Sequence, residues 1–312
     1  MTAAPETLPA EFAMIARHLR PLAGPGALGL ADDAAVLDWP PARLVIAADA
    51  MVQGVHFLPD DPADLVARKL LRTNLSDLAA MGARPYGYLT TLAVPRETPD
   101  AWFAAFAAGL AADQTQFGVS LLGGDTTSTP GPICLSLTIL GTAQRVLTRA
   151  GAQPGDALCV SGTIGDGALG LLAARGEIAD PDGFLAGRYR LPQPRLALGQ
   201  SLVGVARACM DVSDGLVQDV GHLCRAAGLA AEIEADLVPL SPAARAANRR
   251  ALCLTGGDDY ELVFALPAEQ RLPPGCTRIG RFLAGPPGVR VLGIEGLGIE
   301  GLGKGWDHLA QR

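Results

Sequence analysis

Along almost the whole chain, short apolar runs typical of β-strands alternate with stretches that have helix start and stop signals. "ARLVIAADAMV", "YGYLTTLAV" and "ICLSLTILGTA" have strand character. A helix is expected to start at Asp61-Pro62, and another to run from Thr98 to about Phe117. Alternation of this kind is typical of α/β and α+β proteins, in which helices pack in layers on sheets. We therefore expect an α/β fold.

A polar, glycine- and proline-rich segment at residues 144–155 divides the chain into two halves. The second half continues with the strand "DALCVSG", helices over 165–175 and about 194–207, and the strands "YELVFAL" and "RIGRF". A chain of 312 residues is long enough for two domains. We expect an N-terminal domain over residues 1–145 and a C-terminal domain over residues 146–312.

The composition excludes several classes of protein. With 49% apolar and 18% charged residues, the chain can bury a sizeable core, and its net charge of −7 does not suit a bare nucleic-acid-binding surface. The six cysteines form no C-x-x-C pair, and the four histidines form no H-E-x-x-H zinc motif. No signal peptide is evident in "MTAAPETLPAEF", and apolar runs such as "AWFAAFAAGLAA" are shorter than a membrane span. We expect a soluble, cytoplasmic protein with reduced cysteines.

Two glycine-rich segments imitate nucleotide-binding motifs. "GLGIEGLGKG" lacks the Ser or Thr, the preceding strand and the following helix of a P-loop. "GDGALG", with Gly165, Gly167 and Gly170, follows a strand and opens a helix, as a dinucleotide-binding turn does. However, the second parallel strand with its terminal acidic residue is missing from the sequence that follows. We expect neither segment to bind a nucleotide in these ways.

The stretch "CMDVSDGLVQD", from Cys209 to Asp219, concentrates negative charge where a strand end meets a helix. A carboxylate or hydroxyl there can cap the helix by accepting hydrogen bonds from its free N–H groups. One helix start needs only one cap. Capping therefore does not account for both Asp211 and Asp214, which flank Ser213.

Other carboxylates lie at the ends of expected elements, except Asp77. Asp77 lies inside the helix that follows Pro62, on one face with Asn74, where the pair either forms a solvated edge or needs polar partners. The remainder are Asp32 and Asp33 in "ADDAAV", Asp49 in "IAADAMV", Asp125 in "GGDTTS", which we expect to be a loop after a Gly-Gly turn, and Asp258 and Asp259 in "GGDDYELVF".

Carboxylates without nearby thiols or imidazoles are the hard oxygen ligands that Mg²⁺ prefers. Glycines beside them let backbone N–H groups approach phosphate oxygens closely. Together the acidic clusters predict Mg²⁺-bridged phosphate chemistry.

The blocks "ADDAAV", "DAMVQGVHF", "NLSDLAAMGARP", "GGDTT", "MDVSDGL", "GGDDYELVF" and "GWDH" follow one another in order over nearly the whole chain. They resemble the signature blocks of the thiamine-monophosphate kinase family, which is related to aminoimidazole ribonucleotide synthetase and selenophosphate synthetase. The resemblance implies an N-terminal α/β domain that pairs with its twin in a homodimer, and a C-terminal α/β domain. It also implies transfer of a phosphoryl group from ATP to thiamine monophosphate, assisted by several Mg²⁺ ions.

The resemblance assigns roles to individual positions. The implied metal ligands are Asp32, Asp49, Asp77, Asp125, Asp211 and Asp214. The implied ATP contacts are Gly124, Asp125, Arg149 and Ser213. The implied substrate contacts are His56, Asp258 and Trp306.

Three positions depart from the family pattern. Ala31 precedes Asp32-Asp33 where glycine is usual, Ala47-Ala48 lacks a hydroxyl that often lies near a metal, and Asp258 replaces the usual, longer Glu.

Alternatives remain open for three single residues and for the activity. Arg149 can be a surface turn residue, His56 a strand histidine with its bonds satisfied, and Trp306 an anchor for the C-terminal tail. The acceptor phosphate is already ionised, so we expect no catalytic base or nucleophile from the protein. The alternative functions are another ATP-dependent enzyme of the same superfamily and a Mg-nucleotide sensor without turnover.

Overall fold

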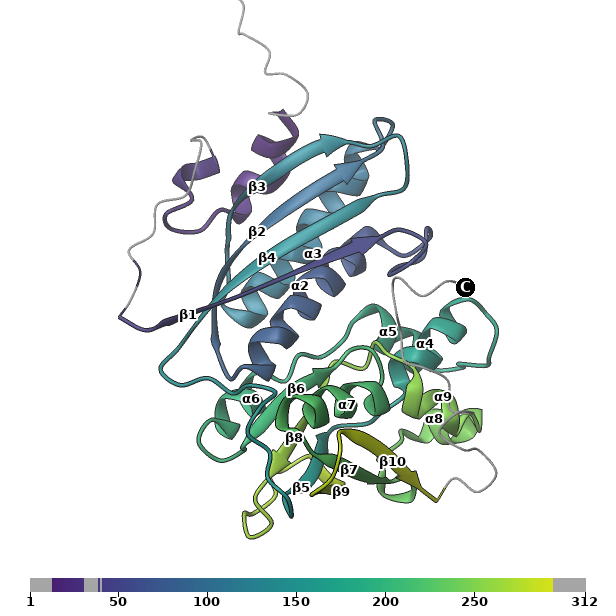
Figure 1. Cartoon of the computed structure of the whole chain (residues 1–312). Coiled ribbons are helices and arrows are strands. Elements are labelled where there is room, and N and C mark those ends of the chain that lie inside the picture. Colours follow the sequence, from purple (N-terminus) through teal and green to yellow (C-terminus); the bar gives the residue numbers. More distant parts are fainter. Residues whose placement is uncertain (1–12, 31–38, 40, 294–312) are drawn as a thin grey trace, which may run out of the picture. The chain divides into compact units, whose positions relative to one another are not determined.

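The computed structural model describes residues 13–30, 39 and 41–293. These residues form two compact units, each with its own sheet (Figure 1). The first unit comprises Met1–Asn74 and Pro85–Thr142, and the second comprises Leu75–Arg84 and Ala143–Arg312. The α/β fold expected from the sequence is confirmed.

The first unit is a four-stranded sheet with the order β1-β4-β2-β3. Its helices lie on one face of this sheet (Figure 1). The bounds are β1 Arg43–Val52, α2 Ala63–Ala80, β2 Arg84–Val94, α3 Asp100–Phe117, β3 Leu121–Ser128 and β4 Cys134–Ala143, preceded by the short helices Ile15–Leu19, Arg20–Leu22 and Leu28–Leu30. The expected strands over β1, β2 and β4 and both expected helices are confirmed. The sequence also predicts a helix over residues 6–20, of which only the end is described, and a strand in "AAVLDW", of which residues 34–38 lie outside the described residues.

A buried ion cluster ties the two long helices of this unit together. Asp113 of α3 is fully buried and accepts hydrogen bonds from Arg72 Nε at 2.7 Å and Nη2 at 2.9 Å, and from Arg68 Nε at 2.9 Å. Arg72 of α2 is itself only 1% exposed, and its guanidinium lies 5.2 Å from the centre of the Phe117 ring. The buried Asp113 carboxylate and the buried Arg72 guanidinium are therefore paired where water does not reach them, while Arg68 stays partly exposed.

The expectation of a loop at "GGDTTSTPG" is wrong for its first six residues. Residues 123–128 continue β3, and Asp125 pairs with Thr91 of the parallel neighbour β2. A Cβ at Gly124 would lie 1.9 Å from Thr90 O, so only glycine lets the two backbones approach this closely. Gly124 thus serves strand pairing, although the Gly-Gly pair indicates a turn in the sequence.

The second unit is a six-stranded mixed sheet with the order β10-β7-β9-β5-β8-β6. Pairing is antiparallel except between β10 and β7. The bounds are β5 Ala157–Ser161, α4 Asp166–Ala174, α5 Phe184–Arg190, α6 Leu196–Leu202, β6 Ala208–Val212, α7 Leu216–Ala227, β7 Ala230–Glu234, α8 Pro242–Ala247, α9 Arg250–Thr255, β8 Glu261–Leu266, β9 Cys276–Leu283 and β10 Gly288–Leu292. The helix expected over about 194–207 is shorter, and β7, β10, α5, α8 and α9 had not been expected.

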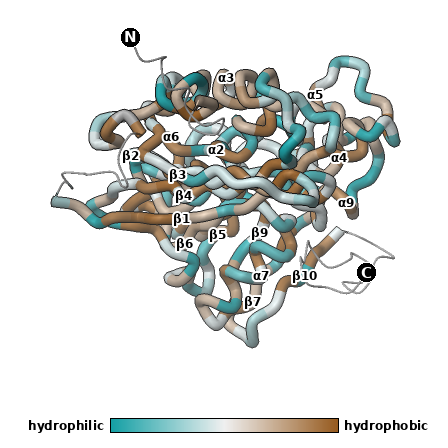
Figure 2. The backbone as a smooth tube through the Cα atoms, turned by 90° about the horizontal axis from the view of Figure 1, so that it is seen from above, coloured by the Kyte–Doolittle hydropathy of each residue, from teal (hydrophilic) through white to brown (hydrophobic). Residues whose placement is uncertain are grey.

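The inner strands β5 and β8 and the edge strand β6 are buried along their whole length, which fits their largely apolar sequences. By contrast, β1 of the first sheet is hydrophobic along most of its length (Figure 2) yet has several exposed residues. Among the described residues, no helix combines the length and apolarity needed to cross a bilayer.

Helix α2 passes from the first unit into the second at Asn74-Leu75. Its last turns, Ala79 and Ala80, belong to a core cluster that includes Leu202 and Phe264. A split at residue 145/146 places these turns in the first domain, whereas the contacts place them with the second.

Candidate functional site

The loop between β6 and α7 positions the acidic stretch that stood out in the sequence. β6 ends at Val212, α7 begins at Leu216, and the strand end that leads into a helix is confirmed. Asp211, at the end of β6, is 5% exposed and accepts a hydrogen bond from Ser76 Oγ of α2 at 2.7 Å. Ser76 directly precedes Asp77, so the end of α2 brings the implied ligand Asp77 into the same unit as Asp211.

The capping role in this loop belongs to Asp219. Its Oδ2 accepts hydrogen bonds, each of 3.1 Å, from the backbone N–H groups of Ser213, Asp214 and Gly215. Desolvation, with repulsion from Asp211 and Asp214, raises the pKa of Asp219 to about 8. One aspartate caps the loop, and Asp211 and Asp214 are left for another purpose.

The second oxygen of the Asp219 carboxyl completes a group of possible metal ligands. Asp219 Oδ1 is buried and has no hydrogen-bond partner. One carboxylate oxygen each from Asp214 and Asp219 and one ring nitrogen of His222 lie within 4.8 Å of one another. A buried acceptor without a partner is unfavourable by itself, and a bound cation would satisfy it.

Two arginines, Arg225 and Arg149, bring positive charge to the His222 member of this group. Arg225 Nη2 lies 3.0 Å from His222 Nδ1. Desolvation and then the charges of Arg225 and Arg149 lower the pKa of His222. Arg149, an implied ATP contact, thus contributes positive charge at His222, a member of the group of possible metal ligands.

A second loop, Gly257 to Tyr260, is joined to the first by its backbone. Asp258 N donates to Ser213 O at 2.9 Å, and Tyr260 N donates to Val212 O at 2.8 Å. These bonds place Asp258, the implied substrate contact, beside Ser213, the implied ATP contact. Asp258 and Tyr260 have φ angles of +69° and +53°, a left-handed conformation that costs about 1–2 kcal/mol per non-glycine residue.

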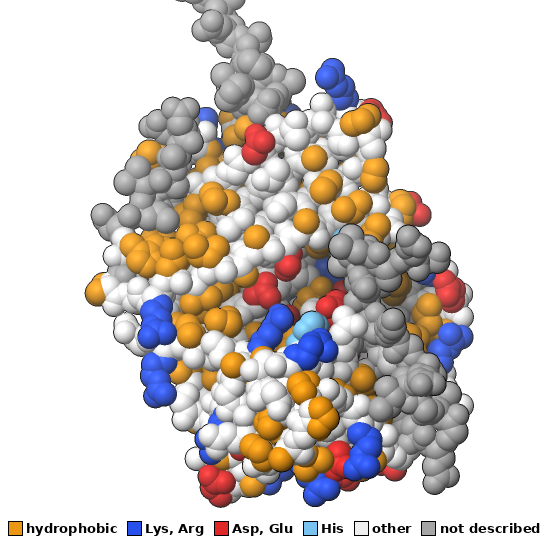
Figure 3. All heavy atoms as spheres, in the orientation of Figure 1, with side chains coloured by type: hydrophobic (Ala, Val, Ile, Leu, Met, Phe, Trp, Pro, Cys, Tyr) orange, Lys and Arg blue, Asp and Glu red, His pale blue; other side chains and the backbone are white. Residues whose placement is uncertain are grey.

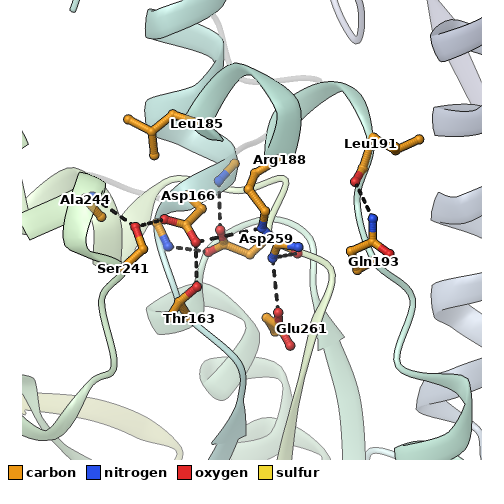
Figure 4. Close-up of polar contacts among 12 residues, drawn as sticks. Thr163, Asp166, Leu185, Arg188, Leu191, Gln193, Ser241, Ala244, Asp259 and Glu261 are labelled. Carbon is orange, nitrogen blue, oxygen red and sulfur yellow. Dashed lines mark hydrogen bonds and ion pairs between the residues drawn. The ribbon is translucent and has the colours of Figure 1, made fainter. Parts of the chain in front are cut away.

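Asp259 lies between these two residues and points into the protein (Figure 4). Its carboxyl is 1% exposed and accepts hydrogen bonds from Gly165 N at 2.7 Å and Gly167 N at 2.9 Å. Desolvation raises the pKa of Asp259 to about 8, against the opposing effect of these two donors. Asp259 therefore fixes the loop to the start of α4.

Around Asp259, a buried polar network connects α4, α5 and β8 (Figure 4). Asp166 accepts from Ser241 Oγ at 2.6 Å and from Thr163 Oγ1 at 2.5 Å. Glu261 of β8 accepts from Arg188 Nη2 at 3.1 Å and from Arg195 Nε at 2.6 Å. The network supports the segment that follows the Asp258 loop.

The same contacts explain the glycines of "GDGALG". A Cβ at Gly167 would lie 2.2 Å from Asp258 O, and one at Gly170 would lie 2.1 Å from Leu185 O. The preceding strand β5 has antiparallel neighbours on both sides. The glycines of this segment serve backbone packing, Asp259 occupies the N–H donors at the helix start, and the antiparallel neighbours of β5 differ from the parallel strands of a dinucleotide-binding unit.

In the first unit, Asp49 of β1 lies near α2. Asp49 N donates to Asn74 Oδ1 at 3.2 Å, and burial raises the pKa of the Asp49 carboxyl while a hydrogen bond with Thr73 opposes that rise. Asn74 is fully buried and also donates to Leu70 O at 2.9 Å. Asn74 is thus a partnered buried residue, and a solvated edge at this position is wrong.

Asp125 lies on the other face of the first sheet. It pairs with Thr91 of β2, and Leu89 and Thr91 point away from the face that carries the buried Leu92. Asp49 has the same strand parity as the buried Val45 and Met51 of β1, so Asp49 and Asp125 lie on opposite faces. Gly124, the neighbouring implied ATP contact, is an exposed position of β3.

His56 follows β1 in a turn. Its Nδ1 accepts a hydrogen bond from Val52 N at 2.9 Å, and its carbonyl accepts one from Lys69 Nζ at 3.0 Å. Asp32 and Trp306 lie outside the described residues, so their predicted roles stay predictions.

Sequence reasoning missed Asp219, His222 and Asp259 as contributors to this region. Asp219 is the third aspartate of "CMDVSDGLVQD", and His222 follows it by about one helical turn, so this spacing could have indicated both residues. Asp259 stands beside Asp258 in "GGDDY", where a pair of acidic residues before a buried strand indicates that one of them points inward.

Comparisons with family models, with curated proteins and with solved structures give consistent results. Residues 31–143 match the model of the AIR synthase related protein, N-terminal domain, and residues 153–293 match that of the C-terminal domain. The thiamine-monophosphate kinase of Caulobacter vibrioides is 51% identical over 271 residues, covering 83% of this chain and 77% of the relative.

Solved structures agree. The thiamine-monophosphate kinase of Stenotrophomonas maltophilia K279a has a TM-score of 0.81 and 41% identity, covering 91% of this chain and 97% of its own. AaThiL complexed with AMPPCP and TMP has a TM-score of 0.78 and 31% identity, covering 89% of this chain and 91% of its own.

Proposed function

The chain belongs to the thiamine-monophosphate kinase family, and on this premise we propose that it transfers the γ-phosphoryl group of ATP to thiamine monophosphate, giving ADP and thiamine diphosphate. The observation that carries the proposal is the junction of two loops in the second unit. The loop with Asp211, Ser213 and Asp214 and the loop with Asp258 share backbone hydrogen bonds. The residues that the resemblance implies for binding metal, nucleotide and substrate therefore lie on two loops that are joined to each other. The AaThiL complex with AMPPCP and TMP supports the two substrates.

The residues present fit Mg²⁺. Asp211 and Asp214 offer carboxylate oxygens, and the buried Asp219 Oδ1 has no partner. We assign metal binding to Asp211 and Asp214 together with Asp77, and to Asp32, Asp49 and Asp125 as the resemblance implies. Bound Mg²⁺ supplies the positive charge that offsets the repulsion between the phosphates of ATP and of the acceptor.

The protein's own groups act by position and charge. The acceptor phosphate oxygen is already anionic, so no side chain needs to remove a proton. Arg149, Ser213 and the backbone at Gly124 hold nucleotide phosphates, while His56, Asp258 and Trp306 hold thiamine monophosphate. The phosphoryl group passes directly between the two substrates, in line and without a phosphoenzyme.

We also assign a homodimer formed through the first sheet. Leu44, Ile46 and Leu89 are 44%, 58% and 40% exposed on this sheet, and hydrophobic side chains gather over its strands (Figure 3). A partner copy would remove this apolar surface from water. Light scattering at micromolar concentration is expected to give the dimer mass, and Ile46→Glu to lower it. A monomeric wild-type protein contradicts this assignment.

The activity is tested by turnover of ATP with thiamine monophosphate in the presence of Mg²⁺. Thiamine diphosphate and ADP are expected in equal amounts, and Asp211→Asn is expected to abolish turnover while circular dichroism stays that of the wild type. Turnover with another phosphate acceptor only indicates a different enzyme of the superfamily. Nucleotide binding without any turnover indicates a sensor.

A folded Asp211→Asn variant with near-normal activity at saturating Mg²⁺ removes Asp211 from the metal ligands. Asp156→Asn is a matched control, because Asp156 is a buried carboxylate of the same unit that accepts from Arg207 Nε at 3.1 Å and has no assigned role in the site.

A further inference from the structure

The segment around Asp258 is held in a conformation that its own residues disfavour. Asp258 and Tyr260, on either side of Asp259, both have positive φ angles. Asp adopts this region fairly often, but a bulky residue such as Tyr does so rarely. Such a backbone persists only where the surrounding contacts determine it, and it is found mostly at functional sites.

Two sets of contacts hold the 257–260 loop in this conformation. The buried Asp259 carboxyl is held by Gly165 N and Gly167 N, and the loop backbone lies directly against Gly167. Backbone bonds to Val212 and Ser213 fix the other side. Asp259 therefore cannot turn outward without breaking two hydrogen bonds inside the protein.

The result is a fixed direction for the Asp258 side chain. Asp258 is partly exposed, and Tyr260 Oη donates a hydrogen bond to its Oδ1 at 3.1 Å. Asp258 is also one methylene shorter than the Glu usual at this position, so its reach depends more on where the backbone holds it.

We propose that Asp259 and Tyr260 are positioning residues that aim the Asp258 carboxylate at the cationic organic part of thiamine monophosphate. The inference rests on the proposed function, which supplies the substrate. Asp259 fixes the backbone beneath Asp258, and the Tyr260 hydroxyl fixes its carboxylate. Neither residue needs to touch the substrate. The thiazolium ring carries the positive charge that a carboxylate held in this way can recognise.

The experiment compares steady-state kinetics of wild type, Asp259→Asn and Tyr260→Phe with both substrates varied. Asp259→Asn replaces one acceptor by an amide donor that faces a backbone N–H, and Tyr260→Phe removes only one hydroxyl. We expect KM for thiamine monophosphate to rise about ten-fold in the first variant and several-fold in the second, while KM for ATP stays within two-fold.

Asp156→Asn is the matched control. Asp156 is a buried carboxylate of the same unit, and it accepts hydrogen bonds from Gln153 N at 2.8 Å and Arg207 Nε at 3.1 Å and not from the 257–260 loop. Its loss is expected to lower Tm without changing the ratio of the two KM values. An equal rise of KM for thiamine monophosphate in this control would show a general structural effect and overturn the inference.

A double-mutant cycle makes the test specific. If Asp259 and Tyr260 act through Asp258, then Asp259→Asn and Tyr260→Phe add no further rise of KM in an Asp258→Ala background. Full additivity overturns the inference. If Asp259→Asn does not fold, Tyr260→Phe decides, and an unchanged KM for thiamine monophosphate overturns the inference.

Failure of the proposed function looks different. In that case the wild-type protein itself gives no thiamine diphosphate. If the wild-type protein forms thiamine diphosphate and both variants keep its KM for thiamine monophosphate, only the positioning roles are rejected.

Discussion

Replacing Asp113 by Ala should destabilise the first unit far more than the same change at Asp100, although both residues lie on α3 and both are paired. Asp113 is fully buried and accepts from two arginines, whereas Asp100 is 54% exposed and accepts from Arg17 and His18. Asp113→Ala removes three charge-assisted hydrogen bonds and leaves the Arg72 guanidinium, only 1% exposed, without its carboxylate.

The magnitude follows from burial. Removing one partner of a buried ion pair costs roughly 3–5 kcal/mol, mainly because the remaining charge stays out of water. For a protein of this size each kcal/mol lowers Tm by about 2–4 °C, which gives a fall of roughly 6–20 °C. Arg68 contributes less to this cost, because it is 22% exposed and water can solvate it. Asp100→Ala should leave Tm close to that of the wild type, since water screens an exposed pair.

Thermal and urea unfolding, followed by circular dichroism and by tryptophan fluorescence, measure both variants. Trp102 of α3 stacks on Phe106 with ring centres 4.9 Å apart and therefore reports on this helix. The double variant Arg72→Met/Asp113→Leu should recover most of the stability, because it leaves no unpaired buried charge.

Equal effects of Asp113→Ala and Asp100→Ala would refute the reasoning. So would a double variant that is less stable than Asp113→Ala alone, since the cost would then come from lost hydrogen bonds and not from a stranded charge.

Three further predictions concern the site. Ser76→Ala removes the donor to Asp211, so the Mg²⁺ concentration for half-maximal activity should rise about 10–100-fold in a Mg²⁺ titration; an unchanged midpoint shows that Ser76 does not tune the metal. Because the pKa of Asp259 is raised to about 8 in the folded protein, its proton stabilises the fold at low pH and this contribution is lost as pH rises to 8. Tm should fall over pH 5–8, and Asp259→Asn should flatten that slope, leaving the part due to Asp219; an identical slope contradicts the assignment. Trp306→Ala should raise KM for thiamine monophosphate several-fold with KM for ATP and Tm little changed if Trp306 stacks on the thiazolium ring, whereas a lower Tm without this selective KM change identifies a tail anchor.

The sequence predicted the regular elements whose signals are local. Asp61-Pro62 marked the start of α2, and the pattern from Thr98 placed the end of α3 at Phe117, where Gly118 follows with a left-handed φ of +67°. The helix-start chemistry of "VSDGL" likewise placed the junction of β6 and α7. These signals depend on hydrogen bonds between residues close in the chain.

Features that depend on distant contacts were not predictable in this way. "GGDTTS" has turn composition, but Gly124 is required by the backbone of β2, more than 30 residues earlier. The partner of Asp259 is the start of α4, more than 90 residues away, so nothing local distinguishes Asp259 from Asp258. Roles within the site followed the resemblance, whereas the coordinates were needed to show that Asp219 is the aspartate that caps the loop between β6 and α7.

The passage of α2 from one unit to the other has a consequence for synthesis of the chain. Residues 75–84 are made early, yet Ala79 and Ala80 bury against Leu202 and Phe264, so their core cannot close until β8 has been made. At roughly 5–20 residues per second, this interval lasts about 10–40 s, during which the last turns of α2 have no final partners. The first unit can therefore fold on the ribosome while the last turns of α2 are still unpacked. A nascent chain stalled before β8 would present these apolar turns to chaperones.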